Sequence, residues 1–379
     1  MKRIVHIDFN YFFVQVEELF DKSLRNVPCA VGSTLGRGII STSNYLARSF
    51  GVRSGMAVSM ALKACPQLKL VHEHYREYSK ISNKIFKFLR SKFNILNQVS
   101  CDECFIDMTE YLKGQNEYDT LRDLQFDIYN KFQIKVSIGL SYTTFLAKMA
   151  SDYKKPLGLT IITPENREEI LYPIKIKDFY GIGKKTAPIL EKNGIETIGD
   201  LVNNKFNMAS SILKNQYSYC LECALGHSSD IVEVTDFDPK SCSAMTTFDT
   251  DTNDYEEIKN ALTDLTRKVS KELQQYHKKA KTIVLTLRDS TFTTKSRRTT
   301  LSKYTDETET ILNAGLKIFT MMKSDETAYR LVGIGVDNLI ETEGKITENV
   351  TTDDIINIFN KELNSDLLFK ANEVKKTEE

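Results

Sequence analysis

The sequence contains 379 residues, of which 41% are hydrophobic and 27% are charged; this balance is typical of a globular protein of roughly two to four domains. The apolar run behind Met1 ends at Asp8, too short for a signal peptide or a membrane-spanning helix, so we expect a cytoplasmic protein with no membrane partner. Seven cysteines without the regular spacing of a disulfide scaffold agree with a reducing compartment.

Charge is unevenly distributed along the chain, although the net charge is zero. Residues 267–303 contain eleven basic and two acidic residues, whereas residues 341–379 contain five basic and ten acidic residues. Because the acidic end cancels the basic segment in the total, the net charge says little about the partners of this protein.

The first residues predict a short β-strand that ends close to a carboxylate. Residues 1–10 are largely apolar, with Asp8 near the end of the run. Tyr11 then opens a predicted helix that continues through Val16 to Phe20.

A small subdomain is expected to follow, over residues 28–77. Within it, residues 30–32 and 38–42 predict two strands joined by a turn rich in Gly, Ser and Thr. Apolar residues then recur at helical spacing over 76–93, which predicts an amphipathic helix that covers a sheet.

Two adjacent carboxylates, Asp102 and Glu103, interrupt a run that otherwise has the pattern of a buried strand. Ionised groups in such a place are costly unless a partner offsets their desolvation, and a divalent cation is a usual solution. Because neighbouring residues of a strand point to opposite faces, we place the pair in a tight turn between two strands. With the strand of Asp8 alongside, three oxygen ligands would suit Mg²⁺ better than Zn²⁺. For isolated acidic residues, a hairpin tip and a strand end would be the simpler interpretation, but the flanking residues favour a metal site.

The middle of the chain predicts one more strand and then mostly helices. Residues 134–140 alternate as a strand with one buried face, residues 145–151 form a helix, and Lys155 lies in the following loop. Residues 180–190 predict a helix-hairpin-helix, whose glycines would let backbone N–H groups approach a DNA phosphate.

The last part predicts a helix over 258–273 and strands over 282–288 and 331–336. Basic side chains on or beside these strands could bind backbone phosphates without reading sequence, although a solvated basic face fits the same residues almost equally well from charge alone. These side chains are Arg288, Lys295, Arg297, Arg298 and Lys303.

Four motifs in order resemble those of the Y family of translesion DNA polymerases, and are most similar to the bacterial DinB type, DNA polymerase IV. They are HIDFNYFFVQVE (6–17), STSNYLARSFGV (41–52), SCDECFID (100–107) and FLAKMASDYKKPLG (145–158). The resemblance implies an α+β right-hand polymerase with a ferredoxin-like palm, small fingers, a helix-hairpin-helix thumb and a βαββαβ little finger. The expected ranges are palm 1–10 and 78–166, fingers 11–77, thumb 167–234, linker 235–242, little finger 243–345 and C-terminal tail 346–379.

The resemblance also implies roles for individual residues. Two Mg²⁺ ions would be held by Asp8, Phe9, Asp102 and Glu103, of which the three carboxylates are catalytic. The incoming dNTP would be contacted by Phe9, Tyr11, Phe12, Phe13, Thr42, Tyr45, Arg48 and Lys155. Phe13 would be the steric gate that excludes a ribose 2′-OH, and Lys155 would hold the γ-phosphate. Without the resemblance, Phe13 could be a core aromatic residue and Arg48 a solvated one.

Partners follow from the same resemblance. Primer-template DNA would contact Gly181, Gly183 and Lys184 in the hairpin and the basic strands near the end of the chain. Leu367, Leu368 and Phe369 resemble the short peptide by which bacterial polymerases bind the sliding clamp, although an ordinary amphipathic helix end is an alternative. The protein is expected to be a monomer.

Two rival interpretations remain to be weighed. Cys101 and Cys104, with Cys220 and Cys223, form two C-x-x-C pairs that can signal zinc, but we interpret all four as small buried hydrophobic residues. A catalytically silent DNA- or clamp-binding protein would be expected to lack a carboxylate, the gate or the lysine, and all are present. The sequence therefore predicts a low-fidelity translesion polymerase with a two-metal mechanism and, since no exonuclease motif is found, no proofreading.

Overall fold

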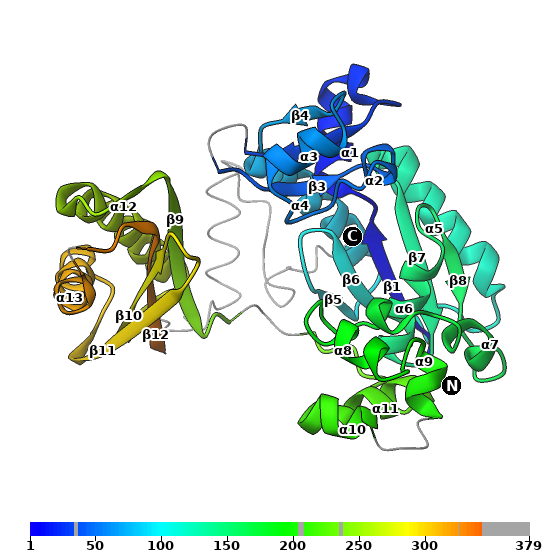
Figure 1. Cartoon of the computed structure of the whole chain (residues 1–379). Coiled ribbons are helices and arrows are strands. Elements are labelled where there is room, and N and C mark those ends of the chain that lie inside the picture. Colours follow the sequence, from blue (N-terminus) through cyan, green and yellow to red (C-terminus); the bar gives the residue numbers. More distant parts are fainter. Residues whose placement is uncertain (34–36, 204–207, 235–237, 325, 343–379) are drawn as a thin grey trace, which may run out of the picture. The chain divides into compact units, whose positions relative to one another are not determined.

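The computed structural model describes residues 1–33, 37–203, 208–234, 238–324 and 326–342 (Figure 1). The chain divides into two compact units, Met1–Asp236 and Phe237–Glu379, which are considered separately. This division falls inside the stretch predicted as a linker, and the other subdomain boundaries stay predictions. The C-terminal tail, including Leu367, Leu368 and Phe369, lies outside the described residues.

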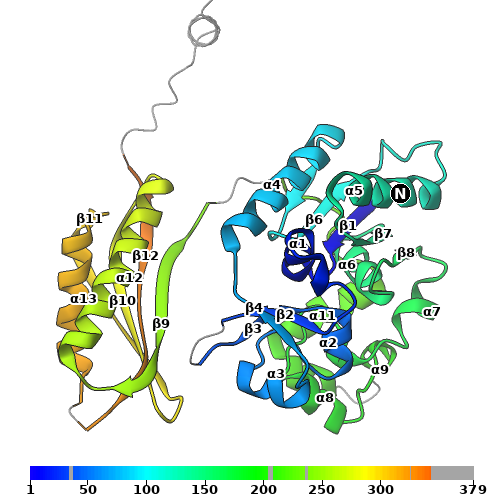
Figure 2. The ribbon, with the colours of Figure 1, turned by 90° about the horizontal axis from the view of Figure 1, so that it is seen from above.

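The centre of the first unit is a five-stranded sheet in the order β5-β6-β1-β7-β8 (Figure 1), of which β6, β1, β7 and β8 are labelled from another side in Figure 2. Strand β1 is antiparallel to both of its neighbours, and β8 runs parallel to β7. The strands are β1 (Ile4–Phe9), β5 (Leu96–Gln98), β6 (Glu103–Asp107), β7 (Val136–Ser141) and β8 (Leu159–Ile161). Every residue of β1 is buried, because helices cover both faces of this sheet.

The alternation of β1 decides which side each of its residues faces. Val5, Ile7 and Phe9 join the core with α1 (Phe12–Phe20), α4 (Tyr75–Lys92) and α5 (Glu117–Phe132). The intervening residues face α6 (Thr144–Tyr153), as the packing of Ile4 against Ala147 shows. Asp8 therefore lies on the α6 side of the sheet.

The predicted elements around the sheet form with small shifts. The helix predicted from Tyr11 begins at Phe12, because Tyr11 itself adopts the left-handed conformation (φ 35°) that turns the chain from β1 into α1. The helix predicted over 76–93 spans Tyr75–Lys92, and the strand predicted over 134–140 spans Val136–Ser141. The prediction that this strand has one buried face is wrong: all six of its residues are buried, because β7 lies inside the sheet between β1 and β8.

A small three-stranded sheet in the order β3-β2-β4 has a core of its own within this unit. Its strands are β2 (Cys29–Gly32), β3 (Ile40–Ser43) and β4 (Lys69–Val71), and the helices that share its core are α2 (Tyr45–Ser49) and α3 (Val58–Ala64). The short η1 (Lys22–Leu24) precedes β2, and its Leu24 packs in the core of the large sheet. The two strands predicted here are antiparallel neighbours, and their joining turn includes residues 34–36, which lie outside the described part.

Short helices with their own core complete the first unit. They are α7 (Arg167–Leu171), η2 (Ile176–Asp178), α8 (Ala187–Lys192), α9 (Ile198–Val202), α10 (Met208–Leu213), η3 (Lys214–Gln216) and α11 (Tyr217–Leu225). Cys220 and Cys223 are buried in this core as unpaired thiols, and Cys104 is buried in the core of the large sheet. The interpretation of all four cysteines as buried is wrong for Cys101, which packs against the large core but is only half-buried, because it lies in the turn before β6.

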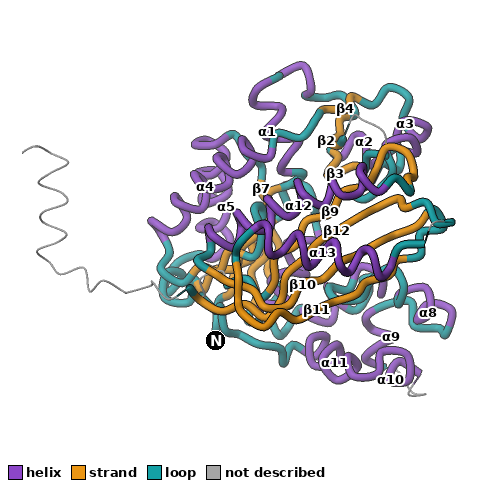
Figure 3. The backbone as a smooth tube through the Cα atoms, turned by 90° about the vertical axis from the view of Figure 1, so that its left-hand side faces the viewer, coloured by secondary structure: helices purple, strands orange, loops and turns teal. Residues whose placement is uncertain are grey.

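The second unit has the predicted β-α-β-β-α-β order. Its elements are β9 (Ser241–Thr252), α12 (Tyr255–Gln275), β10 (Lys278–Asp289), β11 (Thr294–Thr305), α13 (Thr308–Met322) and β12 (Tyr329–Glu341). The antiparallel sheet has the order β11-β10-β12-β9, and α12 and α13 pack on one of its faces (Figure 3). Strand β9 begins at Ser241, inside the stretch predicted as linker.

Candidate active site

Asp8 and Glu103 lie directly opposite each other on neighbouring strands. Asp8 is near the end of β1, Glu103 is the first residue of β6, and the two are register partners. Residues opposite each other in an antiparallel pair project from the same face, so both carboxylates lie on the α6 side. The prediction of a tight turn is confirmed for Asp102, which precedes β6, whereas Glu103 already belongs to the strand.

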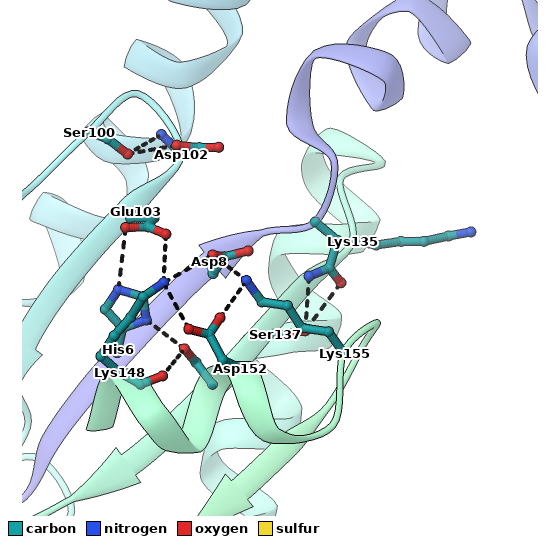
Figure 4. Close-up of polar contacts among 12 residues, drawn as sticks. His6, Asp8, Ser100, Asp102, Glu103, Lys135, Ser137, Lys148, Asp152 and Lys155 are labelled. Atoms are coloured by element: carbon teal, nitrogen blue, oxygen red, sulfur yellow. Dashed lines mark hydrogen bonds and ion pairs between the residues drawn. The ribbon is translucent and has the colours of Figure 1, made fainter. Parts of the chain in front are cut away.

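Asp102 is oriented differently from this pair (Figure 4). Its Oδ1 accepts a hydrogen bond from the Ser100 hydroxyl at 2.6 Å, and its backbone carbonyl accepts one from the Phe9 amide at 2.8 Å. The second bond joins the β5–β6 turn to the end of β1. Burial raises the pKa of the Asp102 carboxyl above its ordinary value, although the hydrogen bond from Ser100 opposes this.

Lys148, to which the sequence analysis assigned no role, links the carboxylates from α6. Its ammonium lies 2.7 Å from Glu103 Oε1, 3.5 Å from Asp8 Oδ2 and 3.4 Å from Asp152 Oδ2, and its side chain is 8% exposed. The signal in the sequence was a charged residue within an otherwise apolar motif, between Leu146 and Met149, where a helical position facing a sheet is expected to be buried.

Lys155 also contacts the carboxylates. Its ammonium donates to Asp8 Oδ2 at 2.5 Å and lies 2.7 Å from Asp152 Oδ1. Burial acts to raise the pKa of Asp8, but the ammonium groups of Lys155 and Lys148 outweigh it and lower that pKa to about 2. Burial and the neighbouring Asp8 raise the pKa of Glu103 instead, against the effect of Lys148.

His6 lies behind this cluster on the same face of β1. Its Nδ1 is 2.8 Å from the Ser151 hydroxyl. Its Nε2 is buried, lies 3.9 Å from Glu103 Oε2 and has no hydrogen-bond partner in the described part of the chain. Burial, together with the charge of Lys148, lowers the pKa of His6 well below its ordinary value, so the ring is neutral near pH 7.

The donor set fits Mg²⁺. Within the described ranges no three His, Cys, Asp or Glu residues are grouped closely enough to hold a metal ion as they stand, which agrees with the different orientation of Asp102. Asp8 and Glu103 nevertheless lie opposite each other on one face of the sheet, and the two ammonium groups of Lys148 and Lys155 are outnumbered by four carboxylates, those of Asp8, Asp102, Glu103 and Asp152. Hard oxygen donors with an excess of negative charge are what a hard divalent cation requires.

A polar cavity of about 220 Å³ opens beside the carboxylates. It is bounded by β1 and α1 on one side and by β3 and α2 on the other. All eight residues predicted to contact the nucleotide line it, together with Ser41 and Ser54, which the sequence analysis did not assign. The lining residues are Asp8, Phe9, Tyr11, Phe12, Phe13, Ser41, Thr42, Tyr45, Arg48, Ser54, Asp102 and Lys155.

Two side chains of α2 present polar groups to this cavity. The Arg48 guanidinium lies 4.8 Å above the Tyr45 ring, and its Nε donates to the Ser43 carbonyl at 2.9 Å. The Tyr45 hydroxyl is buried and has no hydrogen-bond partner among the residues that the structure describes. A buried hydroxyl is rarely left unpaired, so a ligand oxygen is the natural partner for it.

The basic residues of the second unit are divided between the two faces of its sheet. Arg297 and Lys295 on β11 are the register partners of Leu285 and Leu287, whose side chains pack under the helices. Both cations therefore project on the helix side of this edge strand. Arg298 is the partner of Val284, one residue along, and so projects from the opposite, open face.

The remaining predicted DNA contacts lie on β10 and in the hairpin before α8. Arg288 pairs in register with Thr294, on the same open face as Arg298. In the hairpin before α8, Gly181 has a φ of 105°, and a Cβ added at Gly181 or Gly183 would meet nothing within 4 Å. Lys184 is exposed. Their role as phosphate contacts stays a prediction.

Comparisons with known proteins agree with this architecture. The model of the impB/mucB/samB family matches residues 7–152, that of its C-terminal domain matches residues 239–349, and that of the IMS family HHH motif matches residues 164–195. A DNA polymerase IV of Listeria monocytogenes serotype 4b (strain F2365) is 35% identical over 89% of this chain and 95% of its own length. A DNA polymerase IV of Streptococcus sanguinis is 35% identical over 88% of this chain and 96% of its own length.

Solved structures give the same result. A structure described as a Y-family DNA polymerase chimera has a TM-score of 0.78 at 25% identity, covering 90% of this chain and all of its own. DinB from Sulfolobus solfataricus has a TM-score of 0.61, also at 25% identity, with the same coverage. The fold and site thus define a right-hand DNA polymerase, as predicted. Within that class, the chain belongs to the Y family, the impB/mucB/samB proteins, and to its DinB or DNA polymerase IV type.

Proposed function

We propose that this protein adds dNTPs to a primer 3′-OH under the direction of a template, including damaged templates, with low fidelity and without proofreading. The observation that carries the proposal is the single cavity in which the carboxylates Asp8 and Asp102 meet Phe13, Arg48 and Lys155. These are the groups needed to bind metal, sugar and triphosphate at one place.

The proposed roles within the site rest on the family resemblance and are supported by the positions of these residues. Asp8, Glu103, Asp102 and the carbonyl of Phe9 would hold two Mg²⁺ ions, which when bound lower the pKa of the primer hydroxyl and neutralise the triphosphate and leaving pyrophosphate. The ammonium of Lys148 orients Asp8 and Glu103 from behind.

The triphosphate is bound by groups on the opposite side of the cavity. Arg48 and the unpartnered Tyr45 hydroxyl face it from α2, beside Thr42. Lys155, which pairs with Asp8 in this structure, would exchange that carboxylate for the γ-phosphate when a nucleotide enters.

Phe13→Ala is expected to raise ribonucleotide insertion relative to dNTP insertion by about 10²-fold. The ring lines the cavity and cannot hydrogen-bond a 2′-OH, so a ribose would both clash and leave its hydroxyl unpaired. The measurement is kcat/KM for a dNTP and its matching rNTP in single-nucleotide insertion. Unchanged sugar discrimination in a folded Phe13→Ala protein would remove the gate assignment.

Arg288→Ala/Arg298→Ala is expected to weaken primer-template binding and to reduce the slope of log affinity against log salt by about 2. Both side chains lie on the face of the second unit's sheet that α12 and α13 leave open, and we propose that DNA binds this face, so that two phosphate contacts would be lost. Lys295 and Arg297, predicted as DNA contacts from the sequence, project from the helix side and would contribute less. Lys295→Ala/Arg297→Ala removes the same charge from the helix side and serves as the matched control, with a smaller expected change. Equal effects would contradict the assignment of DNA to the open face.

Primer-template DNA and the incoming dNTP are thus the proposed partners. We further propose that the protein is a monomer in the cytoplasm. Its proposed contact with the sliding clamp is through Leu367, Leu368 and Phe369. All seven cysteines are unpaired, as expected in a reducing compartment. None of the helices in the described ranges is long and apolar enough to cross a membrane.

Primer extension with Mg²⁺ and dNTPs, on intact and lesion-bearing templates, tests the proposal. Short, distributive extension that stops when the metal is chelated, and that passes a lesion, is the expected result. The alternative is a catalytically silent DNA- or clamp-binding protein of the same fold. A folded protein that binds primer-template but never extends it would favour that alternative.

A further inference from the structure

A buried carboxylate behind Phe13 has no part in the chemistry proposed above. Glu17 follows Phe13 by one turn of α1 and is 5% exposed. Its Oε1 accepts a hydrogen bond from the Tyr78 hydroxyl at 2.5 Å and another from Nδ1 of His74 at 2.8 Å. Because residues four apart lie on the same face of a helix, Phe13 and Glu17 both face α4, the helix that carries Tyr78.

Tyr78 is the surface against which Phe13 rests. The two rings are stacked, with centroids 4.4 Å apart and planes inclined by 14°. Tyr75 meets Phe13 edge-on at 5.8 Å, and its hydroxyl lies 3.4 Å from the Ser41 hydroxyl, another residue of the cavity wall. Tyr78 is 1% exposed, so its ring is confined on all sides and its hydroxyl depends on Glu17.

We propose that Glu17 is a positioning residue for sugar selectivity: by binding the Tyr78 hydroxyl it fixes the ring that supports Phe13, and thereby the space that Phe13 leaves for the sugar of the nucleotide. This inference rests on the proposed role of Phe13 as the gate. Phe13 can exclude a ribonucleotide only if its ring keeps its position when a 2′-OH is brought against it. A carboxylate suits this task, because hydrogen bonds to an ionised acceptor are stronger than those to a neutral one.

The test compares single-nucleotide insertion of a dNTP and its matching rNTP by the full-length protein. Tyr78→Phe keeps the stacked ring and loses only the hydroxyl, and Glu17→Leu removes the acceptor. Each is expected to lower the ratio of kcat/KM for dNTP to that for rNTP by about tenfold, the equivalent of one charge-assisted hydrogen bond. Insertion of the dNTP itself should change by less than about threefold.

Two further variants show whether Glu17 acts through Tyr78. Glu17→Gln retains an acceptor oxygen and is expected to keep most of the discrimination. The double variant Glu17→Leu/Tyr78→Phe should be no less selective than either single variant, because both remove the same bond. Additive losses would overturn the proposal.

Gln15→Leu is the matched control for a general loosening of α1. Gln15 is buried on another side of the same helix, where its amide donates to the carbonyls of Asn10 and Lys135 and accepts from the Lys135 amide. The variant should lower the melting temperature but leave the dNTP/rNTP ratio unchanged. An equal loss of selectivity in Gln15→Leu would overturn the positioning role.

The outcomes also separate this inference from the proposed function. If Phe13→Ala leaves sugar discrimination intact, the gate itself is wrong. If Phe13→Ala relaxes discrimination but Tyr78→Phe and Glu17→Leu do not, only the role of Glu17 is wrong. Should Glu17→Leu fail to fold, Tyr78→Phe alone decides, because it removes no buried charge and keeps the packing.

Discussion

The double variant Asp102→Ala/Glu103→Ala is expected to lose primer extension by at least about 10³-fold while still binding primer-template DNA. Glu103 is the strand partner of Asp8, and Asp102 lies in the turn that is bonded to the end of β1. Removing both leaves Asp8 as the only carboxylate of the predicted metal site. One carboxylate could not bind two cations or hold them at the distance that the reaction needs. Binding of primer-template DNA should persist, because the predicted DNA contacts are other residues.

The measurement is single-turnover insertion of one dNTP, with binding followed separately by fluorescence anisotropy. Asp107→Asn is a suitable control, because Asp107 also lies on β6 and, among the described residues, its carboxylate accepts hydrogen bonds only from the Lys2 ammonium and the Thr109 amide. It should retain extension. Wild-type rates in the double variant would place the chemistry elsewhere, and loss of extension in Asp107→Asn as well would point to damage to the sheet.

Lys148→Met is expected to lower the free energy of unfolding by about 3 kcal/mol in the absence of divalent metal. The ammonium of Lys148 lies within 3.5 Å of carboxylates from β1, β6 and α6, and its side chain is 8% exposed. Met fills a similar volume without the charge, so the variant leaves Asp8 and Glu103 close together in a poorly solvated place. Mg²⁺ should reduce the difference from wild type, because a bound cation supplies the missing compensation.

Urea unfolding in the presence of EDTA and in the presence of Mg²⁺ gives the free energy of unfolding without and with the metal, for wild type and variant. Lys92→Met is the matched control: Lys92 pairs with Asp127 at 2.6 Å but is 33% exposed, and its loss should cost less than about 1 kcal/mol with or without Mg²⁺. If Mg²⁺ does not reduce the loss in free energy of unfolding caused by Lys148→Met, Lys148 acts in packing alone and not through the carboxylates.

Local sequence determined the elements and the identity of the main site residues. Helix α4 follows from apolar periodicity, which depends only on neighbouring residues, and the position of strand β7 could be predicted in the same way, although not that both of its faces are buried. The carboxylates at positions 8, 102 and 103 could be singled out because charge within an apolar run needs a partner wherever it is. The β-α-β-β-α-β order of the second unit could likewise be predicted from its pattern of elements and from the resemblance.

Only the tertiary structure decided what lies against what. Lys148 reaches Glu103, 45 residues away, because β1 places its even-numbered residues on the side covered by α6. Glu17 and Tyr78 are 61 residues apart and meet only where α1 packs on α4. No periodicity within one segment encodes a contact between two segments, since that contact depends on how the elements pack.

The same reason separates the basic residues of β11. Alternation along the strand shows that Arg297 and Arg298 project from opposite faces of the sheet. It does not show which of the two faces is covered by helices. That was decided by α12 and α13, which cover one face and leave Arg298 on the other. The sequence by itself determined the chemistry available to this protein, and the packing of its helices on its sheets determined where that chemistry is brought together.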